Sequence, residues 1–283
     1  MLQIQYLIKT GRKLDLKNPN RFTEKIQWYK LYYKNPIMPK CVDKYDVRDY
    51  IKSKGLESIL THCYGIYDKV EDIPWTTLPN QFVIKDTLGG GGNSICIVKN
   101  KSTTSIDLLE SKAQSWIAID SRKKGGGREW PYYHGKKHRI IIEEYINSDE
   151  TEEGLVDYKF FCFNGKVEFL YVMGNRSVGQ SVEVSIFDRN FNKLPVRRVG
   201  DKEFKNAKKP TRFDEMIKIA EQLALDFPHV RVDLYNVEGR ILFGELTFYN
   251  ASGYMEYEPD SFDLEIGTKW ELPKIMIEPS FNP

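Results

Sequence analysis

The hydrophobic positions along the chain change period several times, and each period predicts a different kind of element. Phe22, Ile26, Tyr29 and Tyr33 recur at helical spacing after a proline and predict an amphipathic helix near the N-terminus. Similar patterns predict three further helices, at residues 43–54, 104–118 and 213–224.

Strand patterns lie between these helices. Two of the strands flank a run of glycines, and two flank Asn164-Gly165, which is a strong signal for a tight hairpin turn. Helices and hairpins follow one another without a regular strand–helix–strand alternation, so we expect an α+β protein with antiparallel sheets. The predicted strands are residues 82–85, 94–98, 139–146, 158–163 and 167–172.

Residues 230–248 predict another hairpin, which carries charged side chains where strands usually have few. With a three-residue turn over 238–240, Asp233 lies directly opposite Glu245. Acids that share one face of a sheet need a partner, and divalent metals prefer such oxygen ligands. A shared metal site is one interpretation of this hairpin, and an ordinary hairpin with solvated acids is the other.

The length of the turn decides which side chains share a face. The three-residue turn also pairs Arg231 with Thr247 and places both on the face of the two acids, together with Tyr235 and Phe243. A two-residue turn at Glu238-Gly239 would put the acids on opposite faces, because a shift of one residue reverses every side chain. The metal interpretation therefore depends on the register.

The composition is that of a folded globular protein without an extreme charge. The chain has 283 residues with 42 basic and 40 acidic side chains, a net charge of +2, and 41% of its residues are hydrophobic. This length allows one large domain or two to three small lobes. The balanced charge favours neither nucleic acid nor membrane as a partner, and the apolar stretch 4–8 is too short to span a bilayer.

Cysteine and histidine spacing indicates neither a zinc site nor a disulfide framework. The four cysteines are far apart and no signal-peptide pattern precedes them, so we expect reduced thiols and a cytoplasmic protein. The four histidines lack the spacing of metal ligands. These residues are Cys41, Cys63, Cys96, Cys162, His62, His134, His138 and His229.

A glycine-rich loop follows the predicted strand that ends at Lys85. Gly89, Gly90, Gly91 and Gly92 can present several backbone N–H groups to a phosphate while the lysine supplies charge. The spacing matches neither a P-loop nor a dinucleotide-binding fingerprint, and an ordinary glycine-rich hairpin loop is the alternative. The acidic hairpin favours phosphate binding, since Mg²⁺ is usually held by a few carboxylates plus substrate phosphates.

Seven sequence blocks, taken in order, match a known family and cover nearly the whole chain. They are residues 18–28, 43–50, 78–85, 141–145, 157–165, 231–235 and 243–248. In these blocks the chain resembles the ATP-grasp superfamily, and most closely its teichuronopeptide-biosynthesis (TupA-type) branch from bacterial surface-polysaccharide loci. The resemblance implies an ATP-grasp fold in which two α+β lobes hold a nucleotide. It divides the chain into a helical, substrate-side region at 1–80, a small lobe with a phosphate lid at 81–146, and a large lobe with the Mg²⁺-binding hairpin at 147–283.

The resemblance also implies the residues of an ATP site. By matching position, Lys44 and Lys85 would contact the ATP phosphates, Arg231 would face the transferring phosphoryl group with Arg176 as a second cation, and Asp157 would lie near the ribose. The phosphate lid would comprise Gly89, Gly90, Gly91, Gly92 and Asn93, and the hinge that reads adenine through its backbone would comprise Glu143, Glu144, Tyr145 and Ile146.

The metal-binding motif departs from the pattern of the superfamily at one position. The resemblance assigns Mg²⁺ to Asp233, Glu245 and Thr247, but many ATP-grasp ligases end this motif in Glu-x-Asn. A threonine hydroxyl is a weaker ligand than an amide carbonyl, and Asn250 could serve instead. The sequence leaves both possibilities open.

The implied activity is that of an ATP- and Mg²⁺-dependent carboxylate–amine ligase that forms an acyl phosphate and releases ADP. The polysaccharide setting suggests an amino acid or small amine as one substrate and a uronic-acid-type carboxylate of a sugar or nucleotide sugar as the other. Such a reaction needs no side-chain nucleophile, which agrees with the lack of a G-x-S-x-G motif.

Three other functions are compatible with parts of the chain. An ATP-grasp phosphotransferase would phosphorylate a hydroxyl with the same site. A glycosyltransferase is disfavoured because the chain has no Asp-x-Asp triplet. The basic loop 122–139, with its interleaved aromatic residues, could bind an anionic polymer in a non-enzymatic module or could cover the active site as a solvated lid. The oligomeric state stays open.

Overall fold

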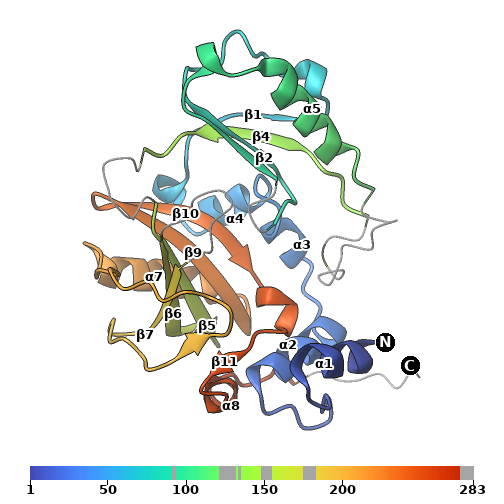
Figure 1. The fold of residues 1–283 in the computed structure, drawn as a ribbon, viewed down its shortest axis with the longest axis vertical. Coiled ribbons are helices and arrows are strands. Elements are labelled where there is room, and N and C mark those ends of the chain that lie inside the picture. Colours follow the sequence, from blue (N-terminus) through green and yellow to red (C-terminus); the bar gives the residue numbers. More distant parts are fainter. Residues whose placement is uncertain (91–93, 121–131, 133–134, 148–154, 175–182, 275–283) are drawn as a thin grey trace. The chain divides into compact units, whose positions relative to one another are not determined.

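The computed structural model divides into two compact units, of which the first is discontinuous in sequence (Figure 1). Unit 1 combines Met1–Asn35 with Thr151–Pro283, and unit 2 is Pro36–Glu150. This division has other boundaries than the three consecutive segments expected above, because residues 1–35 belong to the same unit as the C-terminal half of the chain. The structure describes residues 1–90, 94–120, 132, 135–147, 155–174 and 183–274.

Unit 1 is built on an antiparallel sheet with the strand order β10-β9-β5-β6-β7. The turn between β5 and β6 has positive φ at both Asn164 (50°) and Gly165 (80°), which confirms the predicted tight hairpin. The strands are β5 (Asp157–Phe163), β6 (Lys166–Gly174), β7 (Glu183–Asp188), β9 (His229–Val237) and β10 (Arg240–Thr247).

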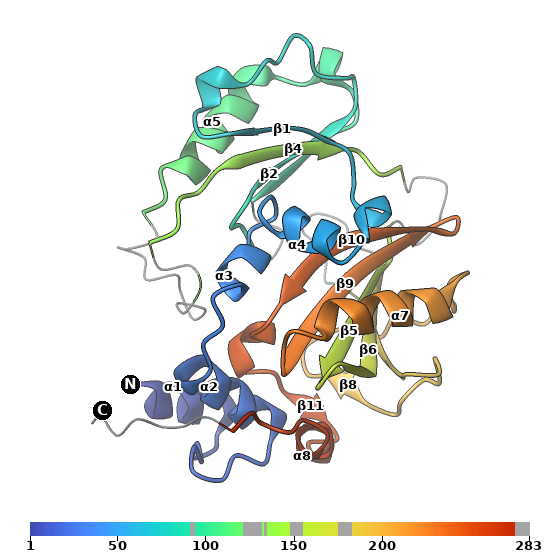
Figure 2. The ribbon, with the colours of Figure 1, turned by 180° about the vertical axis from the view of Figure 1, so that it is seen from behind.

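Helix α7 (Phe213–Ala224) covers one face of this sheet (Figure 2). Phe213 at its start packs 6.0 Å, ring to ring, from Phe160 of β5, and the thiol of Cys162 lies 3.7 Å from the carbonyl oxygen of Ala220. The hydrophobic stripe of the predicted helix at 213–224 therefore faces the sheet, and the prediction is confirmed.

The opposite face of the sheet is covered at one end by an aromatic cluster from three parts of the chain. Helix α2 (Phe22–Tyr32) contributes Phe22 and Tyr29, which pack against His229 of β9 and against Trp270. Trp270 follows helix α8 (Ser261–Thr268). This end of the sheet is thus closed by apolar rings, while the polar residues of the same face lie farther along the strands.

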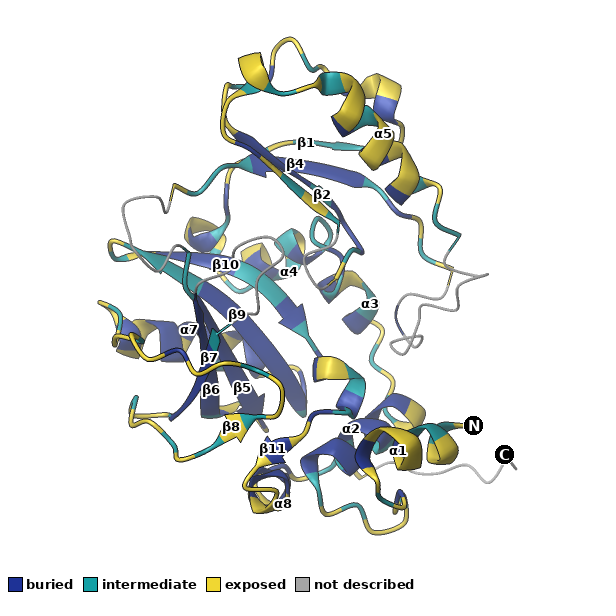
Figure 3. Ribbon diagram, in the orientation of Figure 1, coloured by how far each residue is buried: buried dark blue, intermediate teal, exposed yellow. Residues whose placement is uncertain are grey.

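Smaller elements complete unit 1. Helix α1 (Leu2–Thr10) buries Tyr6 and Thr10 and leaves its other side exposed, as the yellow ribbon in Figure 3 shows. The remaining elements are β8 (Arg197–Arg198), which pairs with β11 (Tyr257–Glu258), and the 3-10 turn η5 (Asn250–Gly253).

Unit 2 contains a second antiparallel sheet, with the order β1-β4-β2-β3. Helix α5 (Ile106–Ile117) packs Leu109, Ala113 and Trp116 against Phe82 and Ile84 of this sheet. The strands are β1 (Cys63–Tyr67), β2 (Phe82–Asp86), β3 (Ile95–Val98) and β4 (Ile140–Glu144). Short helical segments are α3 (Met38–Cys41), α4 (Val47–Ser53), η1 (Glu57–Ile59), η2 (Val70–Asp72) and η3 (Lys101–Thr103).

The helix expected at 43–54 is shorter than predicted. Asp43 accepts hydrogen bonds from the backbone N–H groups of Tyr45 and Asp46 at 2.9 and 3.0 Å, so its side chain forms a turn and the helix begins only at Val47. Among the described residues, no helix is both long and apolar enough to cross a membrane.

Candidate active site

The charged hairpin of unit 1 has the predicted residue pairs, but its turn is shorter than predicted. Asp233 pairs with Glu245, and Arg231 pairs with Thr247. The turn, however, contains two residues, Glu238 and Gly239, both with positive φ (52° and 85°).

A β-bulge restores the register that this short turn would have lost. The pairing shifts by one residue between Phe243 and Glu245, so Gly244 is the extra residue of β10. A Cβ at Gly244 would lie 3.1 Å from the carbonyl oxygen of Asp233, a closer approach than ordinary packing. The bulge therefore depends on glycine, and it places both acids on one face.

The bulge also corrects one part of the expected face. Phe243 precedes the bulge and pairs with Leu234, while Tyr235 pairs with Leu242. Since paired residues point to the same side, Phe243 lies on the face of Leu234 and not on that of Asp233. The prediction that Phe243 shares the acidic face was wrong, because it assumed a strand without a bulge.

Arg231 is the centre of the charged cluster. Its Nε and Nη2 atoms donate to the two carboxylate oxygens of Asp233, each at 2.7 Å, and Nη2 also donates to Oε1 of Glu245 at 2.8 Å. Nη1 donates to the amide oxygen of Asn250 in η5. Fork-shaped pairing of this kind fixes the plane of a guanidinium group as well as its place.

Lys159 of β5 is a member of this cluster that the sequence analysis did not select. It lies between Asp157 and Asp233, with its Nζ atom 3.3 Å from Oδ2 of Asp157 and in contact with Oδ2 of Asp233. The pairing of β5 with β9 brings Lys159 opposite Asp233. Period-two spacing does put Asp157 and Lys159 on one face of their strand, so the signal was present, but the neighbouring strand was unknown.

Burial sets the electrostatics of the cluster. Burial raises the pKa of Asp233, and the positive charges of Arg231 and Lys159 oppose that rise. For Arg231, burial lowers the pKa, but the adjacent carboxylates of Asp233 and Glu245 outweigh it and hold the pKa above its ordinary value. With Asp157 included, three carboxylates surround two cations, so the cluster carries an excess of one negative charge when all groups are ionised.

The predicted metal ligands differ in how open they are. Side-chain exposure is 1% for Asp233 and 42% for Glu245. The hydroxyl of Thr247 lies 3.3 Å from Oε1 of Glu245, whereas Asn250 directs its amide oxygen to Arg231. Among the described residues, no group of three or more His, Cys, Asp or Glu side chains is arranged to hold a metal by itself.

In unit 2, Lys85 is held by a buried carboxylate. Its Nζ lies 2.8 Å from Oε2 of Glu143, whose Oε1 accepts from the Thr61 hydroxyl at 2.7 Å and from Arg48 at 3.2 Å. Burial raises the pKa of Glu143, but Lys85, Thr61 and Arg48 together bring it below its ordinary value. Glu143 is therefore an ionised anchor for two cations.

Lys44 lies in space beside the first residues of the glycine-rich loop. Its backbone N–H donates to the carbonyl oxygen of Thr87 at 3.0 Å, and its Nζ contacts the carbonyl oxygen of Gly89. Gly90 is the last described residue before the gap in this loop. Lys44 thus contacts the glycine-rich loop, and its contact with phosphate stays a prediction.

The predicted adenine hinge divides into two parts. Glu143 and Glu144 belong to β4. The side chain of Glu143 pairs with Lys85, and the backbone N–H of Glu144 donates to the backbone carbonyl oxygen of His62 at 2.9 Å. Tyr145 and Ile146 follow the strand. Backbone recognition of adenine stays a prediction, as does the role of Asp157 near the ribose. Gly91, Gly92, Asn93, Arg176 and most of the basic loop 122–139 lie outside the described residues.

Comparison with known proteins gives the family. A model of the TupA-like ATP-grasp family matches residues 24–271, which is most of the chain. The chain belongs to the TupA-like ATP-grasp family. The predicted ATP-grasp fold is confirmed by this family match.

Three solved structures that are similar to this TupA-like ATP-grasp protein are described as ligases. The D-alanine–D-alanine ligase from Bacillus anthracis has 17% identity and a TM-score of 0.45, over 81% of this chain and 67% of that one. The L-amino acid ligase from Bacillus licheniformis has 14% identity and a TM-score of 0.46, over 89% of this chain and 55% of that one. An ATP-grasp ligase, PsnB, complexed with a minimal precursor, Mg and ADP, has 10% identity and a TM-score of 0.40, over 80% and 57%. No curated protein matches the chain.

Proposed function

We propose that this TupA-like ATP-grasp protein is an ATP- and Mg²⁺-dependent carboxylate–amine ligase. The observation that carries the proposal is the buried cluster in which Arg231 is fixed between Asp233 and Glu245 on one face of a rigid sheet. Phosphoryl transfer depends on such fixed charges, because the transition state spreads negative charge over the transferring group.

The proposed reaction overcomes the low reactivity of a carboxylate. Transfer of the γ-phosphoryl group of ATP to the carboxylate would give an acyl phosphate and ADP. An amine would then attack the carbonyl carbon, form the amide and release phosphate. In this scheme Arg231 faces the phosphoryl group, while Lys44 and Lys85 contact the phosphates of ATP. The ion pair with Glu143 keeps Lys85 in one orientation for that contact.

The residues present fit a Mg²⁺ ion that is shared with ATP. Asp233 and Glu245 offer carboxylate oxygens from paired positions, and Mg²⁺ is commonly held by one or two carboxylates plus substrate phosphates. The excess negative charge of the cluster also favours a cation. Bound there, Mg²⁺ would offset the charge of the phosphates. Because Asn250 accepts from Arg231, we assign the weaker third position to Thr247.

The substrates are proposed from the family. We propose an amino acid or small amine and a uronic-acid-type carboxylate of a sugar or nucleotide sugar, joined in the cytoplasm during surface-polysaccharide biosynthesis. The side chains described above act on ATP and the phosphoryl group, so they are compatible with this choice and do not select the acceptor.

The test is a product assay with purified protein, Mg²⁺, ATP and pooled amines and uronic acids. A ligase releases ADP and phosphate only when both an amine and a carboxylate are present. Arg231→Met should abolish this release, whereas Arg189→Met, which removes an exposed arginine paired with Glu221 in the same unit, should leave it unchanged. Release of AMP would refute the proposal.

Hydroxylamine distinguishes the ligase from a phosphotransferase. Added in place of the amine, hydroxylamine converts an acyl phosphate to a hydroxamate but leaves a phosphate ester intact. A stable phosphorylated product that forms without any amine would show transfer to a hydroxyl and would refute amide formation.

A further inference from the structure

The turn η5, which supplies Asn250 to Arg231, has a backbone that does not hold itself in place. Ala251 and Ser252 have φ values of 44° and 56°, in the left-handed region that residues with side chains rarely adopt. Each such residue costs about 1–2 kcal/mol. Two in succession persist only where the surroundings fix them.

Helix α2 supplies the groups that fix this turn. The amide of Gln27 donates to the carbonyl oxygens of Ser252 and Gly253 at 2.9 and 3.0 Å, and the Nζ of Lys30 also contacts the carbonyl oxygen of Ser252. Gln27 is fully buried and Lys30 is 4% exposed. A buried ammonium group is costly, so Lys30 is not explained by packing alone.

The fit between helix and turn leaves no room for adjustment. A Cβ at Gly253 would lie 2.5 Å from Nε2 of Gln27 and 2.6 Å from Cγ2 of Ile26. The turn therefore rests directly on the helix. A displacement of Gln27 is therefore expected to move the turn, because its side chain holds the carbonyl oxygens of Ser252 and Gly253.

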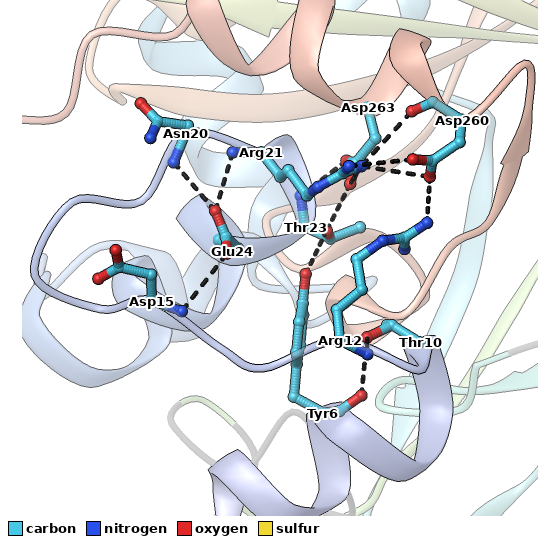
Figure 4. Close-up of polar contacts among 10 residues, drawn as sticks. All are labelled: Tyr6, Thr10, Arg12, Asp15, Asn20, Arg21, Thr23, Glu24, Asp260 and Asp263. Atoms are coloured by element: carbon cyan, nitrogen blue, oxygen red, sulfur yellow. Dashed lines mark hydrogen bonds and ion pairs between the residues drawn. The ribbon is translucent and has the colours of Figure 1, made fainter.

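The opposite end of α2 is anchored independently (Figure 4). Glu24 accepts from the backbone N–H groups of Asn20 and Arg21 at 3.0 and 3.1 Å, and the Thr23 hydroxyl donates to Asp263 at 2.7 Å. With its first turn fixed in this way, α2 is a rigid support for the side chains one turn later. We infer that Gln27 and Lys30 are positioning residues, which act through η5 and Asn250 to hold the guanidinium of Arg231.

The hydrogen bond between Asn250 and Arg231 connects the turn η5, and through it helix α2, to the charged cluster. Asp233 and Glu245 hold Nε and Nη2 of Arg231, whereas Asn250 contacts Nη1. Asn250 is thus the partner that restrains the third nitrogen. Without it the Nη1 side of the guanidinium loses this restraint and the group can shift toward the two carboxylates, and a misplacement of about 1 Å in a catalytic group can cost about 100-fold in rate.

The inference rests on the proposed function for its consequence in catalysis, but its geometry can be measured without any substrate. In ¹⁵N NMR spectra, the Nε and Nη signals of a restrained arginine are sharp. Arg231→Lys identifies the signals of this residue. We expect Gln27→Leu and Lys30→Met to broaden or shift the Arg231 Nη signals.

Lys25→Met is the matched control. Lys25 lies on the same helix and donates to the carbonyl oxygens of Gly267 in α8 and of Trp270 after it, at 2.7 and 2.6 Å, so its loss removes similar bonds there and none from η5. The Arg231 signals of the Lys25→Met variant should match those of the wild type. Unchanged signals in both Gln27→Leu and Lys30→Met, or equal changes in Lys25→Met, would overturn the inference. If the two α2 variants do not fold, Gly253→Ala displaces the turn from its own side and must alter the same signals.

Kinetics then test the path through Asn250. Gln27→Leu should lower the rate of ADP release at saturating ATP about tenfold or more, with KM for ATP nearly unchanged. In an Asn250→Ala background the same substitution should have little further effect, because the two residues act through one contact. Fully additive losses would overturn the inference. Absence of ADP release in the wild type, with the NMR changes present, would refute the proposed function and leave the positioning role intact.

Discussion

Acid sensitivity of unit 1 should depend largely on one histidine. His229 is fully buried among Phe22, Phe163 and Trp270, and its Nδ1 lies 3.1 Å from the carbonyl oxygen of Cys162. Among the described residues its Nε2 has no hydrogen-bond partner. Burial lowers the pKa of His229 to about 3, with a smaller contribution from the charge of Arg231.

The sign and size of the effect follow from proton linkage. In the unfolded chain the imidazole has its ordinary pKa of 6.5, so it takes up a proton as the pH falls below that value while the folded protein resists until about pH 3. The folded state therefore loses stability from pH 6.5 downward. At pH 5 the loss is about 2 kcal/mol, from roughly 1.5 pH units at about 1.4 kcal/mol each.

Urea unfolding at pH 7.5 and pH 5 measures this loss, and hydrogen exchange of peptides from β9 assigns it to unit 1. His229→Asn keeps a donor toward Cys162 but cannot be protonated. Other titrating groups are common to both proteins, so the difference in pH dependence isolates the histidine. We expect the variant to lose about 2 kcal/mol less than the wild type between the two pH values. Equal pH dependence in the two proteins would show that the buried imidazole is not the cause.

Three further substitutions test the site. Glu143→Gln leaves the partly buried cations of Lys85 and Arg48 without their carboxylate, so it should cost about 1–3 kcal/mol in urea unfolding and weaken binding of a non-hydrolysable ATP analogue by calorimetry; unchanged affinity would contradict the anchoring of Lys85. Lys159→Met should lower the thermal midpoint at pH 8 more than at pH 5, because burial already raises the pKa of Asp233 and loss of the lysine raises it further, so protonation of Asp233 at the lower pH removes the charge that the lysine balanced; an equal loss at both pH values would show that the lysine acts by packing. Gly244→Ala should cost about 1–3 kcal/mol, since the added Cβ meets backbone that cannot easily move, and a neutral effect on the urea midpoint would show that the bulge tolerates a side chain.

Local periodicity was sufficient to predict most of the scaffold. Helices α2, α5 and α7 and the hairpin β5–β6 follow directly from spacing and turn residues. In the charged hairpin, the pairing of Asp233 with Glu245 was predicted correctly from a turn that the chain does not use. The glycine inside β10 was the missed signal, because a glycine in a strand often marks a bulge.

Long-range pairing limited what the sequence could show of the site. Lys159 joins Asp233 only because β5 lies beside β9, two strands separated by about seventy positions in the chain. The side chain of Glu143 reaches Lys85 because β4 lies beside β2, a contact that the sequence analysis did not predict. Buried ion pairs between distant strands depend on strand order, which periodicity along one segment does not encode.

The discontinuity of unit 1 has a consequence for synthesis on the ribosome. Phe22 and Tyr29 of α2 are fully buried, yet their partners His229 and Trp270 are made two hundred or more residues later. At about 5–20 residues per second, this apolar helix waits roughly 10–50 seconds before its partners emerge. Unit 2 is complete well before then, so we expect stalled nascent chains to contain a protease-resistant unit 2 that follows a cleavable N-terminal segment. Until His229 and Trp270 are made, helix α2 exposes an apolar stripe that chaperones can bind.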